Sequence, residues 1–314
     1  MYRVAGTSKP KLYPPQLTLS SVVPQQAAGQ STTVNTTFVN NGAEAVTNVR
    51  VGLKAPSGWT VKALTATKAD RVAVGHEVLA AFKVTAPASL PAPIASYDLI
   101  ATAAAGWSGG TEKVTTTSSA VIASPVQAPW KTYTDTTALF GQQGANLAID
   151  GAGADVYGST DQYSTIYQQG AEHDGSTTVV KITAQADTNA WAKAGIMIRN
   201  DITKPASSPG YAILAEAPGK GYVLQWDSNG DGQLDSNSAP SDSGSGTAVY
   251  PSWLKLVRSG SAVTGYYSTD GTSWTQVGTA TLPGIAATQD VGVFTTSHSD
   301  GTSGESDFTG FSQN

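Results

Sequence analysis

The runs WAKAGIMIRN at 191–200, YAILAEA at 211–217 and GYVLQW at 221–226 decide the fold of the C-terminal half of the chain. They are short, and Pro, Ser and Gly separate them, which is typical of β-strands joined by turns. Successive side chains of a strand point to opposite faces, so each run has two faces. The acidic stretch DSNGDGQLD at 227–235 follows the third run directly.

The alternation predicts how these faces are composed. In the first run one face carries Ala194, Ile196 and Ile198, and the other carries Gly195, Met197 and Arg199. In the third run Tyr222, Leu224 and Trp226 lie opposite Val223 and Gln225. An apolar face opposite a mixed polar and aromatic face suits one sheet of a β-sandwich that holds a ligand. We therefore predict a C-terminal sandwich that binds a ligand and is not catalytic.

The composition favours an all-β protein of two domains. A chain of 314 residues is long enough for two cores, and 33 Gly and 16 Pro favour many short strands and turns. Helical periodicity nowhere persists beyond about two turns. The net charge of −5 and the absence of a basic patch argue against nucleic acid and against an anionic membrane surface. No apolar run approaches the roughly 18 residues of a membrane span.

The compartment is predicted less directly. The chain has no cysteine, which excludes disulfides and thiol chemistry but does not fix the compartment. Residues 1–15 lack the charged and then apolar layout of a signal peptide. We predict a secreted, extracellular protein, so we expect this chain to be a piece of a longer one whose signal lies upstream.

The N-terminal half contains seven short alternating strands within residues 16–123, which is the pattern of an immunoglobulin-like sandwich. Phe38 and Trp59 are interpreted as core residues, because aromatic side chains in such strands are usually buried. The segment NNGAEAVTNVRVGLKAPSGWTV at 40–61, together with 77–103, resembles the β-sandwich domain that accompanies alpha-galactosidases and other bacterial glycoside hydrolases. MYRVAG at 1–6 resembles the last strand of alpha-galactosidase-type hydrolases. The resemblance implies a spacer domain without catalytic residues.

The C-terminal half is similar to the concanavalin A-like (laminin G-like) jelly-roll modules of bacterial carbohydrate-active enzymes. Residues 167–169, 191–201 and 253–278 carry this resemblance, and it implies a jelly-roll fold and a carbohydrate context without naming a sugar. The predicted organisation is a tail at 1–15, an immunoglobulin-like sandwich at 16–123, a Pro-containing linker at 124–130 and a jelly-roll at 131–314.

The acidic loop predicts a calcium site. Asp227, Asn229, Asp231 and Asp235 form the spacing D-x-N-x-D-G-x-x-D, whose alternate side chains converge on one hard cation. The loop resembles the first nine residues of an EF-hand, and Gly232 permits its sharp turn.

The resemblance ends at the twelfth position of the loop, where Ser238 replaces the glutamate of the EF-hand. The missing ligand then comes from elsewhere, with Asp242 as one source. The alternative is a solvated acidic hairpin loop that holds no metal.

A sugar site needs an aromatic face and fixed hydrogen-bonding groups. The predicted ligand-binding residues are Tyr167, Gln168, Trp191, Arg199, Gln225 and Trp226. Among them, Trp191 lies in a turn and is a plausible platform. The alternative places Tyr167 and Trp226 in the core and pairs Arg199 with a carboxylate. The hairpin 268–274 resembles the Asp-box of sialidases, one residue short, and is interpreted as a structural turn.

No catalytic motif was found. The three histidines stand alone, and the chain has no G-x-S-x-G elbow. Glu305 and Asp307 are the only pair comparable to the paired carboxylates of jelly-roll glycosidases.

We predict a monomeric, non-catalytic accessory region that binds polysaccharide or glycan and is covalently attached to a glycoside hydrolase. One alternative is a jelly-roll hydrolase or lyase that uses Glu216, Glu305 or Asp307. Another is an extracellular adhesion or spacer module without a sugar ligand.

Overall fold

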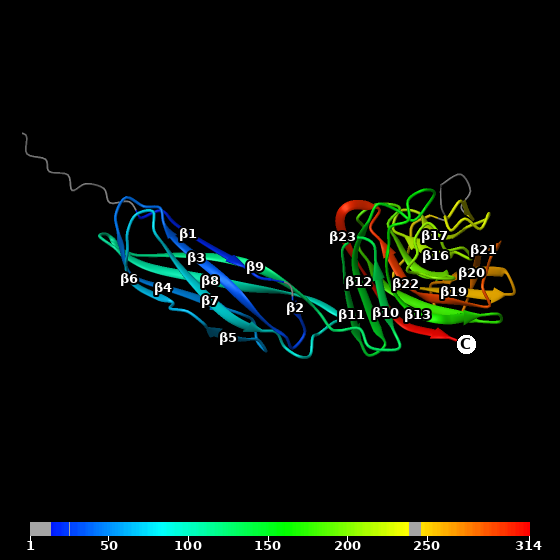
Figure 1. Ribbon diagram of the computed structural model, residues 1–314, viewed down its shortest axis with the longest axis horizontal. Helices are drawn as coiled ribbons and strands as arrows, with labels where there is room; N and C mark the ends of the chain where they lie inside the picture. The colour runs from blue at the N-terminus through cyan, green and yellow to red at the C-terminus, as the bar shows by residue number, and fades with distance from the viewer. Residues whose placement is uncertain (1–13, 25, 239–245) are drawn as a thin grey trace, which may run out of the picture. The chain divides into compact units, whose positions relative to one another are not determined.

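The computed structural model describes residues 14–24, 26–238 and 246–314. All the regular secondary structure in these ranges is β-strand (Figure 1). This confirms the all-β prediction. Within these residues no helix is long and apolar enough to cross a membrane. Two positions named above, the MYRVAG run and Asp242, lie outside the described residues.

The chain divides into two compact units. The first comprises Met1–Leu90 and Ala95–Ile122, and the second comprises Pro91–Ile94 and Ala123–Asn314. Each unit has its own hydrophobic core, so we describe each separately as the N-terminal and the C-terminal domain.

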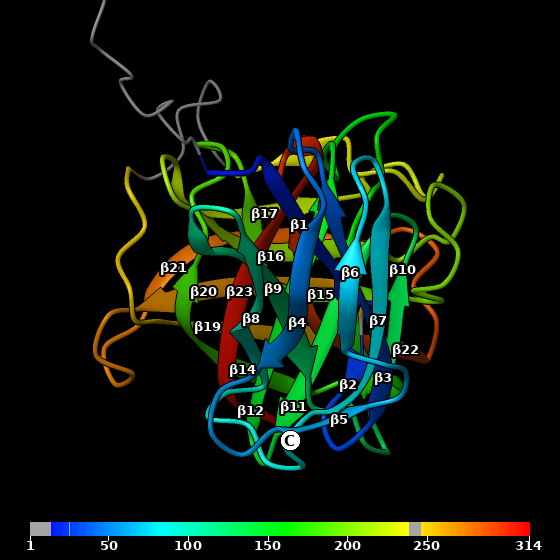
Figure 2. The same cartoon turned by 90° about the vertical axis from the view of Figure 1, so that its left-hand side faces the viewer.

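The N-terminal domain consists of two antiparallel sheets, and Figure 2 shows neighbouring strands β4 and β6 of one of them. The four-stranded sheet has the order β1 (Leu17–Val22), β3 (Ser31–Asn40), β7 (Glu77–Thr85), β5 (Thr60–Ala63). The five-stranded sheet has the order β2 (Gln26–Ala27), β9 (Gly110–Ala123), β8 (Ile94–Trp107), β4 (Val46–Lys54), β6 (Lys68–Val72).

Alternation along the strands builds the core of this domain. In β3, Val34 and Phe38 are fully buried while their neighbours face outward. Trp59 is 9% exposed and packs edge-on against Tyr97, with ring centroids 5.3 Å apart. The interpretation of Phe38 and Trp59 as core residues is confirmed.

The C-terminal domain consists of two seven-stranded antiparallel sheets. The first, called the pocket sheet below, has the order β10 (Lys131–Thr134), β13 (Ser164–His173), β22 (Thr288–Thr296), β15 (Lys193–Arg199), β16 (Ala212–Ala217), β17 (Gly221–Trp226), β18 (Ser236–Asn237). The second, called the strip sheet, has the order β11 (Ala138–Gln143), β12 (Asn146–Gly153), β23 (Ser299–Gln313), β14 (Thr177–Gln185), β19 (Ser252–Ser259), β20 (Ala262–Ser268), β21 (Thr275–Thr281).

The predicted faces of β15 and β17 are confirmed. One core cluster, formed by side chains from both sheets, contains Ala194, Ile196, Ile198, Tyr222 and Leu224, with Trp226 packed against it. A second cluster contains Met197 and Val223. The pocket sheet therefore buries both of its faces. One face packs against the strip sheet, and the other contributes Met197 and Val223 to the second cluster.

Loops cover the outer face of the pocket sheet. The second cluster joins strand residues such as Met197 and Phe294 to loop residues that include Val156, Ile202 and Leu234. The loops after β12, β15 and β17 thus close over this face. Whatever opening they leave is the natural place for a ligand, because a cleft walled by loops on a rigid sheet holds side chains in fixed positions.

Candidate functional site

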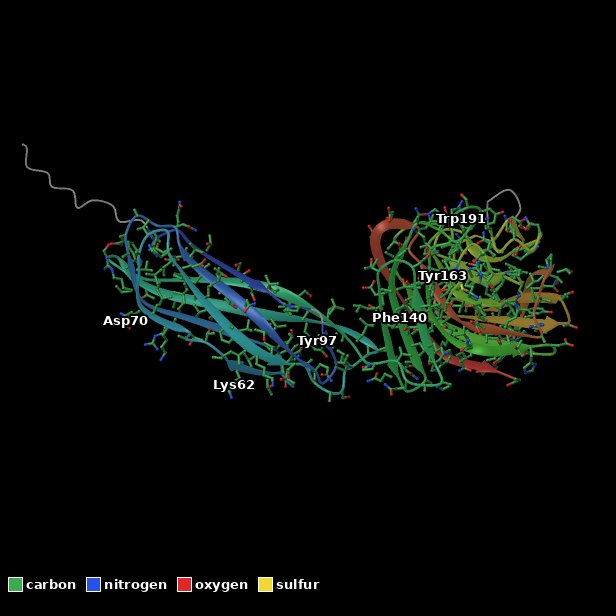
Figure 3. All side chains as sticks on the ribbon, viewed as in Figure 1. Lys62, Asp70, Tyr97, Phe140, Tyr163 and Trp191 are labelled. Atoms are coloured by element: carbon green, nitrogen blue, oxygen red, sulfur yellow. The ribbon has the colours of Figure 1, made fainter. Side chains whose placement is uncertain are left out.

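Two of the predicted ligand residues, Trp191 and Gln225, line a pocket of about 230 Å³ in the C-terminal domain. Trp191 lies at the margin of this domain, whereas Tyr163 lies within it (Figure 3). The full lining is Asp155, Tyr157, Trp191, Lys193, Gln225, Asn237 and His298. The pocket therefore combines one indole ring with amide, hydroxyl and charged groups.

Local structure explains how the two predicted residues reach this pocket. Trp191 follows a turn in which the Asn189 side chain accepts a hydrogen bond from the Trp191 N–H at 2.9 Å. Gln225 lies on β17, on the face opposite Leu224, and pairs with Asn237 of β18. A turn residue and a strand residue thus meet beside the first residue of β15, Lys193.

The pocket contains a buried charge pair. The Lys193 ammonium contacts Asp155 Oδ1, and the Lys193 side chain is only 2% exposed. His298 Nε2 lies 3.3 Å from the other carboxylate oxygen of Asp155. Burial lowers the pKa of Lys193, and the charge of Asp155 opposes that effect. The carboxylate therefore contacts both a lysine and a histidine side chain in the pocket lining.

Lysines also orient the indole ring. Lys193 Nζ lies 5.6 Å and Lys220 Nζ 5.2 Å from the centre of the Trp191 ring. An ammonium group within about 6 Å of an aromatic face is attracted by the ring quadrupole. These contacts hold Trp191 in one orientation at the pocket wall.

Gln225 supplies an unused hydrogen-bond acceptor. The residue is 4% exposed, and no group of the described residues donates a hydrogen bond to its buried Oε1 atom. An unpaired buried polar group costs roughly 1–3 kcal/mol, so such groups in native proteins call for an explanation. A ligand hydroxyl that donates to this oxygen would remove the cost.

Tyr157 and Asn237 form the rim of the pocket. The Tyr157 hydroxyl donates to the carbonyl of Asp235 at 3.1 Å and accepts from Asn237 Nδ2 at 3.1 Å. The rim is therefore connected to the acidic loop 227–235.

The other four predicted ligand residues lie elsewhere. Tyr167 is 4% exposed and belongs to the second core cluster, while Trp226 packs against the inter-sheet core. Gln168 is half-buried on β13, opposite Val291. Arg199 is fully buried. Of the six predicted ligand residues, the pocket thus brings together only Trp191 and Gln225.

Arg199 joins the loops that cover the pocket sheet. Its Nε donates to the Ser208 carbonyl at 3.0 Å, and Nη1 donates to Asp161 Oδ2 at 2.7 Å. Nη2 donates to the Gly232 carbonyl, and the guanidinium lies 4.0 Å from the Tyr211 ring centre. The guanidinium thus satisfies buried groups from three loops, which agrees with the alternative that Arg199 pairs with a carboxylate.

The acidic loop is organised by its own backbone. Asp227 is fully buried, and its carboxylate accepts from the N–H groups of Asn229, Gly230 and Gly232 at 2.6–3.2 Å. The expected turn at Gly232 is present, with φ at +88° and no room for a Cβ beside Ser207.

The polar side chains of the same loop already bond to the loop itself. Asn229 and Asp231 accept from the backbone two residues on, and both oxygens of Asp235 accept from Ser228. Ser238 bonds to the backbone of Leu224. In the described part of the chain no three His, Cys, Asp or Glu side chains group closely enough to hold a metal. The described side chains alone thus do not form a cation cage, and calcium stays a prediction.

The carboxylates proposed for catalysis occupy two different environments. Glu216 is fully buried, accepts a hydrogen bond from the Ser252 hydroxyl, and has its pKa raised to about 8 by burial. Glu305 and Asp307 lie on one face of β23, and burial together with the neighbouring carboxylates raises the pKa of Glu305 to about 7. Glu216 is sealed between the sheets, whereas Glu305 is half-exposed.

Several pocket residues were not predicted from the sequence. Lys193 carried a signal, because a lysine within the apolar run 191–200 must find a partner if it is buried. Asp155 and His298 carried none, since they are far apart in sequence and only the fold brings them together.

A known family matches part of the N-terminal domain. Residues 26–106 match the NPCBM-associated, NEW3 domain of alpha-galactosidase. The predicted resemblance to an alpha-galactosidase-associated domain is therefore confirmed for this segment. No curated protein matches the chain.

Three solved structures show distant similarity. A functionally unknown protein from Saccharomyces cerevisiae is 16% identical, with a TM-score of 0.45, over 59% of this chain and 95% of its own. The exoplasmic/lumenal domain of VIP36 in its Ca²⁺/Man3GlcNAc-bound form is 11% identical, with a TM-score of 0.40, over 60% and 86%. The GH43 BlXynB protein from Bacillus licheniformis is 12% identical, with a TM-score of 0.39, over 84% and 64%.

Proposed function

We propose that the chain is a non-catalytic, carbohydrate-binding accessory region of a secreted glycoside hydrolase. The N-terminal domain acts as a spacer, and the C-terminal domain binds a sugar in the pocket beside Trp191. The family match of residues 26–106 supports the enzyme context. The unpaired, buried Oε1 of Gln225 in a pocket that also contains an indole ring is the observation that carries the binding proposal.

The pocket chemistry suits one sugar ring. The Trp191 ring offers an apolar surface to the C–H groups of a sugar, and Gln225 Oε1 accepts from a hydroxyl. Asp155 accepts from a second hydroxyl, while Lys193 and His298 hold its carboxylate still. The volume of about 230 Å³ is below the roughly 300–1,000 Å³ of pockets for drug-sized ligands. We therefore propose that the ligand is a terminal sugar and not an internal stretch of chain.

Such a module contributes to catalysis through proximity. A single small pocket gives modest affinity, because a small ligand offers few contacts against the cost of lost freedom. Covalent attachment compensates for this, since a short linker gives an effective concentration of about millimolar. The hydrolase then stays near its polymer without any new chemistry.

Binding and cleavage assays test this proposal. The chain is applied to a glycan array, and release of reducing sugar from the same glycans is measured. We expect binding without release, and we expect Trp191→Ala to weaken binding at least about tenfold. Trp107→Ala in the N-terminal domain is the matched control and should bind normally. Absence of binding to every glycan would favour the spacer alternative instead.

One observation favours the catalytic alternative. Glu305 has a pKa raised to about 7, which is the range in which a general acid works best, and it lies beside Asp307. If the chain releases reducing sugar, Glu305→Gln should abolish that release while leaving pocket binding intact. Release by the unmodified chain would replace the non-catalytic proposal with this one.

A further inference from the structure

The outer face of the strip sheet carries a row of alternating lysine and aromatic side chains. We call Lys181 of β14, Trp253 and Lys255 of β19, Tyr266 of β20 and Trp274 before β21 the lysine–aromatic strip. All five side chains are half-buried, while the residues between them, such as Leu254 and Val180, fill the core. The strip therefore faces away from the partner sheet.

Strand register brings the five side chains together. Lys181 pairs with Trp253 across β14 and β19, and its Nζ lies 4.6 Å from the centre of the Trp253 ring. Lys255 pairs with Tyr266 across β19 and β20. Its Nζ lies 4.6 Å from the Tyr266 ring and 4.2 Å from the Trp274 ring. The strip spans four adjacent strands, which is about 14 Å at the usual strand spacing.

Among the residues that the structure describes, the two ammonium groups of the strip have no anionic partner. The ion pairs within the described ranges involve Lys193, Arg199, Lys204 and His298. Neither Lys181 nor Lys255 forms an ion pair or donates a hydrogen bond to another described residue. An ammonium group has three N–H donors, so six donors are directed at solvent or at a ligand.

The carboxylate in the neighbouring hairpin, that of Asp270, already accepts hydrogen bonds from its own turn. Asp270 accepts from the N–H groups of Thr272 and Ser273, both at 2.7 Å, and from the Ser268 hydroxyl at 2.9 Å. These bonds lower the pKa of Asp270 and hold its charge within the turn. In a chain with a net charge of −5, two uncompensated lysines beside three aromatic rings form a local cationic surface.

We propose that the lysine–aromatic strip binds a polysaccharide that contains uronic acid residues. Each uronate ring combines a C–H face for Trp253, Tyr266 or Trp274 with a carboxylate for Lys181 or Lys255. The strip extends over four strands and suits a polymer laid across them, in contrast to the small pocket on the other sheet. On the far side of β14, Asp307 and Glu305 repel the polymer and confine it to the strip.

Affinity electrophoresis through gels that contain polygalacturonate tests the proposal. We expect the unmodified chain to be retarded by polygalacturonate, less so as salt is added, and not by fully methyl-esterified polygalacturonate. The double variant Lys181→Met/Lys255→Met should lose at least about tenfold in affinity. Lys62→Met/Lys83→Met removes two opposed, exposed lysines of the N-terminal domain and is the matched control, expected to bind normally.

A second variant and a second polymer make the result decisive. Trp274→Ala keeps both lysines and should also weaken binding, while thermal unfolding verifies that each variant is folded. Equal retardation by the esterified polymer, full binding by the double lysine variant, or equally tight binding of poly-glutamate would overturn the proposal. Trp191→Ala should bind polygalacturonate normally, so failure of the strip proposal is separable from failure of the pocket proposal.

Discussion

The two outer faces of the C-terminal domain differ in how their charged and aromatic side chains are arranged. On the pocket sheet, loops cover the face, Lys193 is paired with Asp155, and Trp191 is held at the wall of a small cavity. On the strip sheet, Lys181 and Lys255 lie over half-exposed rings, and no carboxylate within the described ranges pairs with them. A small pocket whose charged groups are paired selects a small ligand by shape. An open cationic face attracts an extended anion, and its binding depends on salt.

The largest expected effect is a loss of stability when the charge pair on the pocket sheet is broken. Asp155→Ala leaves the buried Lys193 ammonium without its partner, and breaking such a pair costs about 3–5 kcal/mol of unfolding free energy. Urea unfolding measures this loss.

Two further variants calibrate the Asp155 result. Asp201→Ala removes an exposed pair with Lys204 and should cost less than about 1 kcal/mol. Asp155→Leu/Lys193→Met removes both buried charges and should be milder than Asp155→Ala. Equal losses for Asp155→Ala and Asp201→Ala would mean that solvent reaches Lys193 and that the two faces do not differ in this respect.

Glu216, buried between the two sheets, should make the free energy of unfolding depend on pH. The folded pKa of about 8 exceeds the ordinary value of 4.5, so between these values the folded state holds a proton that the unfolded state has released. The free energy of unfolding should therefore fall as pH rises from 4.5 to about 8 and level off above. The total loss is of the order of a few kcal/mol.

Glu216→Gln should remove the part of this pH dependence that Glu216 contributes, leave the part that Glu305 contributes, and raise stability at pH 7. Urea unfolding across the pH range measures both. A variant whose stability still falls as steeply with pH as that of the unmodified chain would mean that another group titrates.

Calcium tests the loop that helps to cover the pocket sheet. If the loop 227–235 binds Ca²⁺, saturation at about 100 times the Kd stabilises the fold by about 2.7 kcal/mol. Chelation should then lower the melting temperature by several degrees. Asp231→Ala should abolish that response. If chelator leaves the melting curve unchanged, the loop binds no calcium, and its own N–H donors alone stabilise it.

Gln225→Leu separates stability from binding in the pocket. Removing the unpaired buried acceptor should raise the unfolding free energy by about 1 kcal/mol. The same change should weaken sugar binding by about tenfold, because the hydroxyl acceptor is lost. Thermal unfolding and a binding titration measure the two effects. A loss of stability would show that the amide has a partner in the folded protein.

Patterns along the chain were sufficient for the fold class and for the strand faces. Alternation in β15 and β17 predicted which side chains face the same way, because a strand repeats every two residues whatever its neighbours are. The same alternation did not show that loops would cover the outer face. Arg199 was therefore predicted as a ligand residue, although in the structure it bonds Asp161, Ser208 and Gly232.

The sequence by itself determined an all-β protein with alternating faces, a turn at Trp191, and the sharp turn at Gly232. These are local properties, governed by backbone conformation and by the two-residue period of a strand. Only the tertiary structure decided that Asp155, Lys193 and His298 meet beside Trp191, and that Lys255 lies between Tyr266 and Trp274. Those contacts depend on sheet order and register, which join residues that are distant along the chain and leave no local signal in it.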